Sequence, residues 1–198
     1  TAVDRSQHAL SFVETKKVQA SCDNIPVSDK SYDMVFSSEL LEHLNDEVLA
    51  GTVAEIKRLT KKYIFITVPN NENADKLSIK CAKCKYIYNS PNHLRSFDIN
   101  KLQSLFQEYK LIDTFTFGKK VRYYNRGLLK VKTKLSPSSS WIPYYWIPKE
   151  KRNTTCPSCE HSFHYDYKFN PISFGVDVVN VLISPKKPYW LFAVFEKK

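Results

Sequence analysis

Glycine is scarce in this chain, whose 198 residues include four glycines, Gly51, Gly118, Gly127 and Gly175, none beside another. The sequence therefore contains no glycine-rich loop of the kind that holds a phosphate or a nucleotide. Long apolar runs are also absent, since none approaches the roughly 18 residues of a membrane-spanning helix. No internal repeat or heptad pattern is present, which excludes a solenoid and a coiled coil.

The composition suits one compact domain. Hydrophobic residues make up 42% and aromatic residues 14% of the chain, which provides enough apolar surface for a single core. The formal net charge is +10, so the chain favours acidic partners. Because the chain lacks an apolar span and has paired cysteines that suit a reducing compartment, we expect a soluble, cytoplasmic protein.

Strands and helices alternate in the first third of the sequence. Residues 34–36 and 63–68 are short apolar runs rich in β-branched and aromatic side chains, as expected of parallel strands buried on both faces. Between them, residues 45–59 begin with acidic and end with basic side chains, and Leu49, Val53 and Ile56 share one helical face. The order strand, helix, strand predicts a right-handed crossover.

Acidic residues end the strands expected upstream. Residues 1–4 and 18–23 fit strands, separated by a helix at residues 6–14 that Ser6 caps. In an open α/β sheet the carboxyl ends of the strands line the ligand crevice, and an acidic residue there holds a nucleotide ribose. Asp4 fits that role. The alternative is that an aspartate in this position forms a turn or caps a helix.

Three motifs in this region match a known pattern in order. Residues 26–35 fit P-x-x-D-x-S-F-D-x-V with Tyr32 in place of the Phe, residues 39–44 fit E-x-L-E-H-L, and residues 68–70 give V-P-N at a strand end. The chain thus resembles class I S-adenosylmethionine (SAM) dependent methyltransferases of the type 11 group. The resemblance implies a Rossmann-like, mostly parallel α/β sheet whose last strand is antiparallel, with SAM as cofactor.

The resemblance also implies roles for individual residues. Asp23 is expected to accept a hydrogen bond from the adenine amino group, and Ser38, Glu39 and His43 to lie near the methionine moiety and the methyl acceptor. The full set of expected SAM-binding residues is Asp4, Arg5, Cys22, Asp23, Asn24, Ser38, Glu39 and His43.

The family's glycine-rich loop has no counterpart in this chain. In the family that loop follows the first strand of the sheet, so it would precede Thr1. A sheet that begins at its second strand has a slot with unpaired backbone groups, each costing about 1 to 3 kcal/mol when buried. We therefore expect native residues upstream of Thr1 that complete the SAM site.

Four of the five cysteines form two pairs, each with a gap of two residues: Cys81 with Cys84, and Cys156 with Cys159. Such a gap lets both thiolates of one turn reach a single tetrahedral ion, so two pairs predict a four-thiolate zinc site. Four thiolates leave no open position for a substrate, which indicates a structural metal. The alternatives are a disulfide, a redox Cys-x-x-Cys and coincidence.

Histidines follow the second cysteine pair. His161 and His164 either replace a cysteine as metal ligand or lie exposed on the hairpin that carries the pair. The resemblance to the family resumes before that pair, where His93, Arg95 and Phe97 match H-x-R-x-F and Asp98 is placed to cap the next helix.

The cysteine pairs are therefore expected in insertions of one continuous fold, as in zinc-containing bacterial members of the family. We predict a single methyltransferase domain over residues 1–198, in which the insertions 71–92 and 119–170 form a zinc-binding, substrate-covering subdomain. Downstream, residues 171–183 fit a helix and residues 189–195 fit the last strand.

The second insertion combines positive charge with aromatic side chains. Residues 119–135 contain no acidic residue, and residues 141–148 are rich in Tyr and Trp. Such a segment attracts an anionic acceptor, an anionic membrane surface or RNA, and its aromatic rings stack on a sugar or a base. A solvated basic helix and a rigid loop that covers the core are the alternatives.

The sequence predicts a SAM-dependent methyltransferase that acts on a small-molecule acceptor or on a glycan- or lipid-linked one. Catalysis would consist mainly of positioning and desolvation, with at most one base to remove the acceptor's proton. His43 and His93 are the candidate catalytic residues, although His43 also fits a helical turn and His93 a loop anchor. The alternatives are a non-catalytic zinc-binding adaptor with a degenerate methyltransferase fold, and an RNA methyltransferase.

Overall fold

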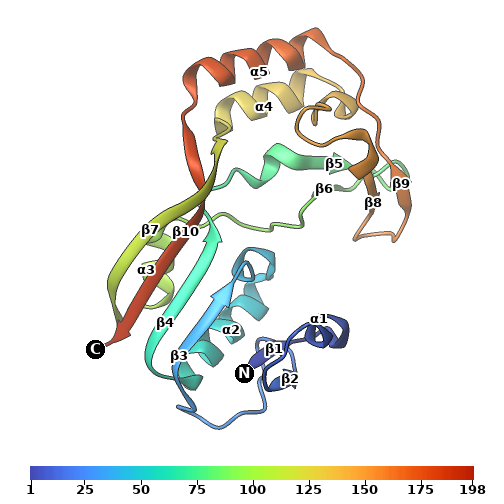
Figure 1. The fold of residues 1–198 in the computed structure, drawn as a ribbon. Helices are drawn as coiled ribbons and strands as arrows, with labels where there is room; N and C mark the ends of the chain where they lie inside the picture. Colours follow the sequence, from blue (N-terminus) through green and yellow to red (C-terminus); the bar gives the residue numbers. More distant parts are fainter. The chain divides into compact units, whose positions relative to one another are not determined.

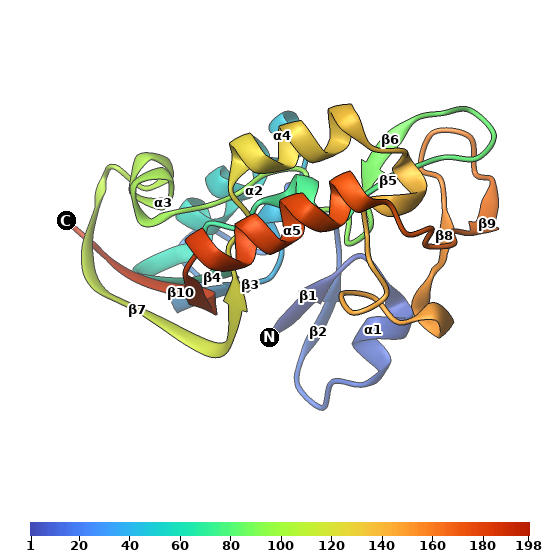
Figure 2. The ribbon, with the colours of Figure 1, turned by 90° about the horizontal axis from the view of Figure 1, so that it is seen from above.

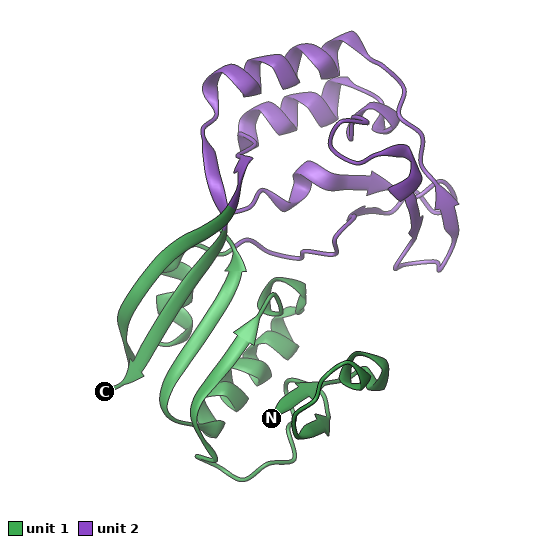
Figure 3. Ribbon diagram, in the orientation of Figure 1, with its two compact units in different colours: residues 1–70, 97–118, 190–198 green, residues 71–96, 119–189 purple.

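The computed structural model describes all of residues 1–198, which divide into two compact units (Figure 3). Unit 1 comprises residues 1–70, 97–118 and 190–198, and unit 2 comprises residues 71–96 and 119–189. The chain therefore leaves unit 1 twice and returns to it twice. None of the helices is long and apolar enough to cross a membrane.

Unit 1 contains the first part of the chain and the strands that return to it (Figure 1). Its elements are β1 (Ala2–Asp4), α1 (Gln7–Ser11), β2 (Lys17–Gln19), β3 (Tyr32–Ser38), the 3-10 turn η1 (Leu41–His43), α2 (Asp46–Leu59), β4 (Thr60–Pro69), α3 (Ile99–Leu105), and most of β7 (Tyr109–Arg122) and β10 (Lys186–Lys197).

The main sheet has the order β3-β4-β10-β7. β3 and β4 are parallel, and β10 is antiparallel to β4, with Leu191 opposite Val68. This confirms the antiparallel last strand, but the sheet of four is mixed where a mostly parallel sheet was expected, because β10 enters between β4 and β7. β1 and β2 are parallel to each other and form a separate two-stranded sheet.

The core of unit 1 lies on one face of this sheet. Ile64, Ile66 and Val68 alternate along β4 and are fully buried. They pack with the apolar stripe of α2, with Leu102 and Phe106 from α3 and its end, and with alternate residues of β10. Ser6 and Asp98 cap α1 and α3 through their side chains, as expected from the sequence, and Asn45 caps α2 in the same way.

The other face of the sheet is more open than the sequence suggested. Met34 and Phe36 of β3 are 52% and 55% exposed, so the expectation that residues 34–36 are buried on both faces is wrong. Instead, a row of aromatic rings crosses the four strands in the order Phe36, Phe65, Phe192 and Phe115. Apolar runs do not distinguish one buried face from two.

Unit 2 is built from two short hairpins and a pair of helices (Figure 2). β5 (Ser78–Lys80) pairs with β6 (Ile87–Asn89), and β8 (Asn153–Thr155) pairs with β9 (Ser162–His164), both antiparallel. Helix α4 (Arg126–Leu135) lies beside helix α5 (Pro171–Ile183). The 3-10 turns are η2 (Ala74–Leu77), η3 (Ser138–Ser140) and η4 (Lys149–Lys151). The helix expected at residues 171–183 is confirmed.

Arg58, in the last turn of α2, fixes the loop that leads into β3. Its guanidinium donates to the carbonyls of Val27 and Ile25 at 2.6 and 2.9 Å, and to the carboxylates of Asp29 and Glu55. Glu55 also accepts from the backbone N–H of Ile25 at 2.8 Å. The hydrogen bond from Arg58 lowers the pKa of Glu55 below its ordinary value of 4.5; burial opposes this shift and the N–H of Ile25 adds to it.

We expect Glu55→Gln to flatten the acid dependence of the stability of unit 1. A carboxylate whose pKa is lowered by folding contributes stability above its unfolded pKa, and that contribution is lost as the pH falls through the folded pKa. Urea unfolding between about pH 3 and pH 6 should therefore show a steeper loss in the wild type than in the variant. Glu47→Gln, exposed on the same helix, is the matched control. Parallel curves for wild type and Glu55→Gln would contradict this role.

Candidate cofactor edge and metal centre

Asp4 ends β1 and also turns the chain into α1. Its carboxylate accepts from the N–H of Ser6 at 2.7 Å, and Ser6 in turn caps α1 by accepting from the N–H of Ala9. Asp4 and Arg5 are exposed, and the carbonyl of Arg5 accepts from the side chain of Gln19. Asp4 therefore forms the turn that was the alternative to ribose binding, and its carboxylate remains exposed at the end of β1.

The turn at residues 21–24 is held directly against α2. Asp23 accepts from the hydroxyl of Ser21, and the N–H of Asn24 donates to the carbonyl of Ser21. The hydroxyl of Thr52 lies 3.2 Å from the sulfur of Cys22. A Cβ atom added to Gly51 would lie 2.8 Å from the Cβ of Asp23, closer than such atoms approach. Gly51 therefore allows the turn to rest on the helix, which explains one of the four glycines.

The end of β3 has a constrained backbone. Ser38 accepts from the hydroxyl of Thr67 at 3.0 Å, and the N–H of Glu39 donates to the carbonyl of Thr67. Glu39 has a φ of 48°, a left-handed conformation that is uncommon for residues other than glycine and is often found at functional sites. The E-x-L-E-H-L motif forms this turn and η1, in which His43 Nε2 is 3.9 Å from the buried carboxylate of Glu42.

His93 belongs to unit 2, whereas His43 belongs to unit 1. The Nδ1 atom of His93 is hydrogen-bonded to the carboxylate of Glu72, and its backbone N–H donates to the side chain of Asn89. The imidazole of His93 is buried. These contacts describe the loop anchor that the sequence offered as one role of this residue.

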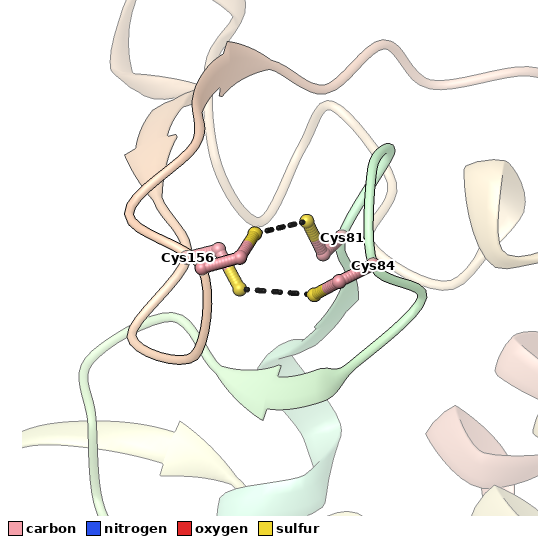
Figure 4. A group of neighbouring side chains, drawn as sticks. Cys81, Cys84 and Cys156 are labelled. Carbon is pink, nitrogen blue, oxygen red and sulfur yellow. Dashed lines mark hydrogen bonds between the residues drawn. The ribbon is translucent and has the colours of Figure 1, made fainter.

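The four paired cysteines of unit 2 come together. Their sulfur atoms all lie within 4.8 Å of one another, and Figure 4 shows the thiols of two separate loops turned toward each other. The Sγ atoms of Cys81 and Cys159 are 3.7 Å apart, and those of Cys84 and Cys156 are 3.6 Å apart. A tetrahedral zinc centre with Zn–S bonds of about 2.3 Å requires sulfur atoms separated by roughly 3.8 Å. The thiols are free, so no disulfide joins them.

The two loops that carry these cysteines have the same backbone structure. In each, the first cysteine follows a strand directly, and the residue after the second cysteine has a positive φ, 66° at Lys85 and 56° at Glu160. The N–H of that residue donates to the carbonyl of the first cysteine in both loops. Tyr88 and Thr154 join the hairpins by a hydrogen bond of 3.1 Å between their side-chain oxygens. Two equivalent turns thus present four sulfur ligands.

The local electrostatics favour a thiolate at Cys81. Burial raises the pKa of this thiol, but the backbone N–H groups of Cys84 and Lys83 and the neighbouring thiols outweigh it and lower the pKa to about 6. His161 and His164 contribute nothing to the cluster, because His161 stacks on Phe163 and His164 pairs with Asn153 and Asp166. The four sulfur atoms are therefore, without either histidine, the number of donors that a tetrahedral ion requires.

Unit 2 also contains a small cavity that the sequence did not identify. Its volume is about 240 Å³. Two basic residues of α4, Arg126 and Lys130, line it together with Asn73, Asp75, Ser78, Ile87, Leu129, Thr133 and Trp141. The absence of acidic residues from 119–135 was the signal available in the sequence, but spacing alone could not show which of its basic residues face a cavity.

Comparison with known proteins agrees with this fold. Residues 1–66 match the family model described as a methyltransferase domain. A SAM-dependent methyltransferase from Archaeoglobus fulgidus has a similar structure, with a TM-score of 0.54 and 15% sequence identity over 98% of this chain and 74% of that chain. A SAM-dependent methyltransferase from Thermotoga maritima has a TM-score of 0.50 and 13% sequence identity over 99% of this chain and 72% of that chain. No curated protein matches the sequence.

We expect Cys156→Ser to abolish zinc binding, because three thiolates and a hydroxyl hold the ion far more weakly than four thiolates. The protein purified with zinc should contain about one ion per chain by elemental analysis, and the variant almost none. Cys22→Ser, which changes the one cysteine outside the cluster, should retain the metal. Equal zinc content in both variants would show that the cluster is not a metal centre.

Proposed function

We propose that this SAM-dependent methyltransferase (EC 2.1.1.-) binds the methyl donor at the strand ends of unit 1 and methylates a small molecule or a glycan- or lipid-linked acceptor. The observation that carries the donor site is the arrangement of polar residues at the ends of β1, β2 and β3. These residues are Asp4, Arg5, Cys22, Asp23, Asn24, Ser38, Glu39 and His43. Strand ends of this kind bind nucleotides in open α/β sheets.

The geometry of these residues suits the donor. Asp4 is exposed at the end of β1, where a carboxylate accepts from ribose hydroxyls, and the turn containing Asp23 rests on α2. Glu39 is held beyond β3 by its left-handed backbone. The sulfonium of bound SAM supplies an electrophilic methyl group. The protein's residues then have to position the acceptor and exclude water.

A base is needed where the acceptor must lose a proton. We favour His43 over His93, because His43 lies in unit 1 with the proposed donor residues and stands beside the carboxylate of Glu42. Such a carboxylate stabilises an imidazolium as it forms. His93 remains the second candidate, with Glu72 as its partner.

The cavity of unit 2 supports the choice of acceptor class. About 240 Å³ accommodates a small polar group, and Arg126 and Lys130 would attract an anionic one such as a phosphate. We propose zinc at Cys81, Cys84, Cys156 and Cys159 as a structural ion that holds the two hairpins of this insertion together. Because the four thiols are free, we place the enzyme in the cytoplasm.

Gly51→Ala should weaken binding of S-adenosylhomocysteine by about fivefold or more, because the new methyl group displaces the Asp23 turn and weakens at least one hydrogen bond. The dissociation constant is measured by isothermal titration calorimetry on the full-length protein. Gly175→Ala is the matched control, since nothing lies within 4 Å of a Cβ atom at that helical position. If both variants bind like the wild type, the turn does not contribute to the donor site.

With radiolabelled SAM and a cell extract divided into small-molecule, lipid and RNA fractions, we expect label in the small-molecule or lipid fraction. His43→Asn should reduce that transfer by about 100-fold, far more than it weakens binding of S-adenosylhomocysteine, because the proposed base is lost in addition to one donor contact. His93→Asn, tested in parallel, distinguishes the two candidates. Label confined to RNA would refute the proposed acceptor class and favour an RNA methyltransferase.

A further inference from the structure

Helix α5 has an inverted arrangement of polar and apolar residues. The buried residues of the helix are Ser173, Asp177 and Asn180. Ser184, which caps the end of the helix, is buried as well. Their spacing of three or four residues makes one continuous stripe along the helix. All four are polar, whereas a helix that packs on a hydrophobic core buries an apolar stripe. The apolar side chains of α5 therefore lie outside this buried stripe.

Specific contacts hold this polar stripe against the rest of unit 2. The carboxylate of Asp177 accepts from the buried ammonium of Lys132 on α4 at 2.8 and 2.9 Å. It also accepts from the hydroxyls of Tyr124 and Tyr145. Burial raises the pKa of Tyr124, and its contact with Asp177 adds to the shift. Each polar group thus has a partner, and this ordered seam fixes which face of α5 is turned outward.

The outward face of α5 consists of apolar residues without a single charge. The exposed fraction ranges from 41% at Val178 to 79% at Leu182. The large hydrophobic residues exposed on the helix are Ile172, Phe174, Val178, Val179, Val181, Leu182 and Ile183, and Phe169 precedes it at 67%. Leaving so many large apolar side chains in water is unfavourable, at about 25 cal/mol for each Å². Contiguous surfaces of this kind mark interaction sites.

Basic residues flank this helix in the chain. Lys168 precedes the helix, and Lys186 and Lys187 follow it. On the neighbouring helix α4, Val131 and Leu135 are exposed, and Leu135 lies one turn beyond Lys132, which faces α5. Lys134 is exposed on the outer side of the same helix. Residues 114–149, which include all of α4, contain no acidic residue. The exposed apolar side chains of α5 are therefore accompanied by lysines at both ends of the helix and by a neighbouring helix without acidic residues.

We propose that the outward face of α5 docks unit 2 onto an anionic lipid bilayer. The apolar side chains enter the boundary between head groups and acyl chains, while the flanking lysines bind lipid phosphates. Helix α5 has 13 residues and therefore spans about 20 Å, too short to cross the membrane but suited to lie in its surface. A second copy of the chain fits this face less well, because a symmetric dimer would bring the flanking lysines of both copies together.

The proposal does not depend on methyl transfer, and sedimentation with lipid vesicles tests it directly. The vesicles contain phosphatidylcholine and phosphatidylglycerol in a ratio of about 3:1, or phosphatidylcholine alone. We expect the full-length protein to bind the anionic vesicles and to bind the neutral ones far more weakly. Val178→Asp with Leu182→Asp should abolish sedimentation. Lys134→Glu with Lys186→Glu should lower the partition coefficient by about tenfold or more.

The charge-matched control is Lys101→Glu with Lys110→Glu, two exposed lysines of unit 1, which should bind like the wild type. If the aspartate variant does not fold, the lipid dependence and the lysine variants still decide the outcome. Failure of the wild type to bind anionic vesicles would overturn the proposal. So would equal loss of binding in the two lysine variants, because that result indicates net charge alone. A lipid-free dimer that the aspartate variant disrupts, without vesicle binding, would assign the face to a second copy instead.

Discussion

The burial of strand β4 is the constraint on which unit 1 depends. β4 is hydrogen-bonded to β3 on one side and to β10 on the other, and three of its side chains are fully buried among α2, α3 and β10. Through Thr67, the same strand fixes Ser38 and Glu39 at the end of β3. Through α2, which packs in the same core, it also supports the turn that contains Asp23. The proposed donor site is thus positioned by one packed strand, and the chain enters unit 2 directly after it.

Unit 2 is held together in a different way. Its hairpins are only three residues long on each side, and short strand pairs are marginal without further support. The four sulfur atoms and the contact between Tyr88 and Thr154 supply that support. The helices are joined by the buried pair of Lys132 and Asp177, and burial lowers the pKa of Lys132 while the carboxylate opposes the shift. Buried polar groups and the cysteine cluster, rather than a large apolar core, hold this part of the fold together. That arrangement leaves the apolar face of α5 outside.

Local patterns in the sequence predicted the elements whose signals are local. The caps at Ser6 and Asp98, the helix at residues 171–183 and the approach of the two cysteine pairs are examples. The sequence did not predict which faces are buried. The apolar run around Met34 resembles a doubly buried strand, and the Val-rich helix α5 resembles a core helix, yet both expose apolar side chains. The reason is that burial depends on partners distant in the sequence. No spacing rule connects Lys132 to Asp177 or Gly51 to Asp23, because those pairs form only when the elements pack.

Direct binding of S-adenosylhomocysteine to the full-length protein is the measurement that tests the central claim. Isothermal titration calorimetry should give a single site with a dissociation constant of about micromolar, corresponding to roughly 8 kcal/mol of binding free energy. Asp4→Ala should weaken that binding, because it removes the carboxylate at the end of β1. Absence of any binding heat, with zinc content and folding intact, would contradict a donor site at these strand ends. The insertion that carries the four-cysteine cluster would then be the functional part of the protein.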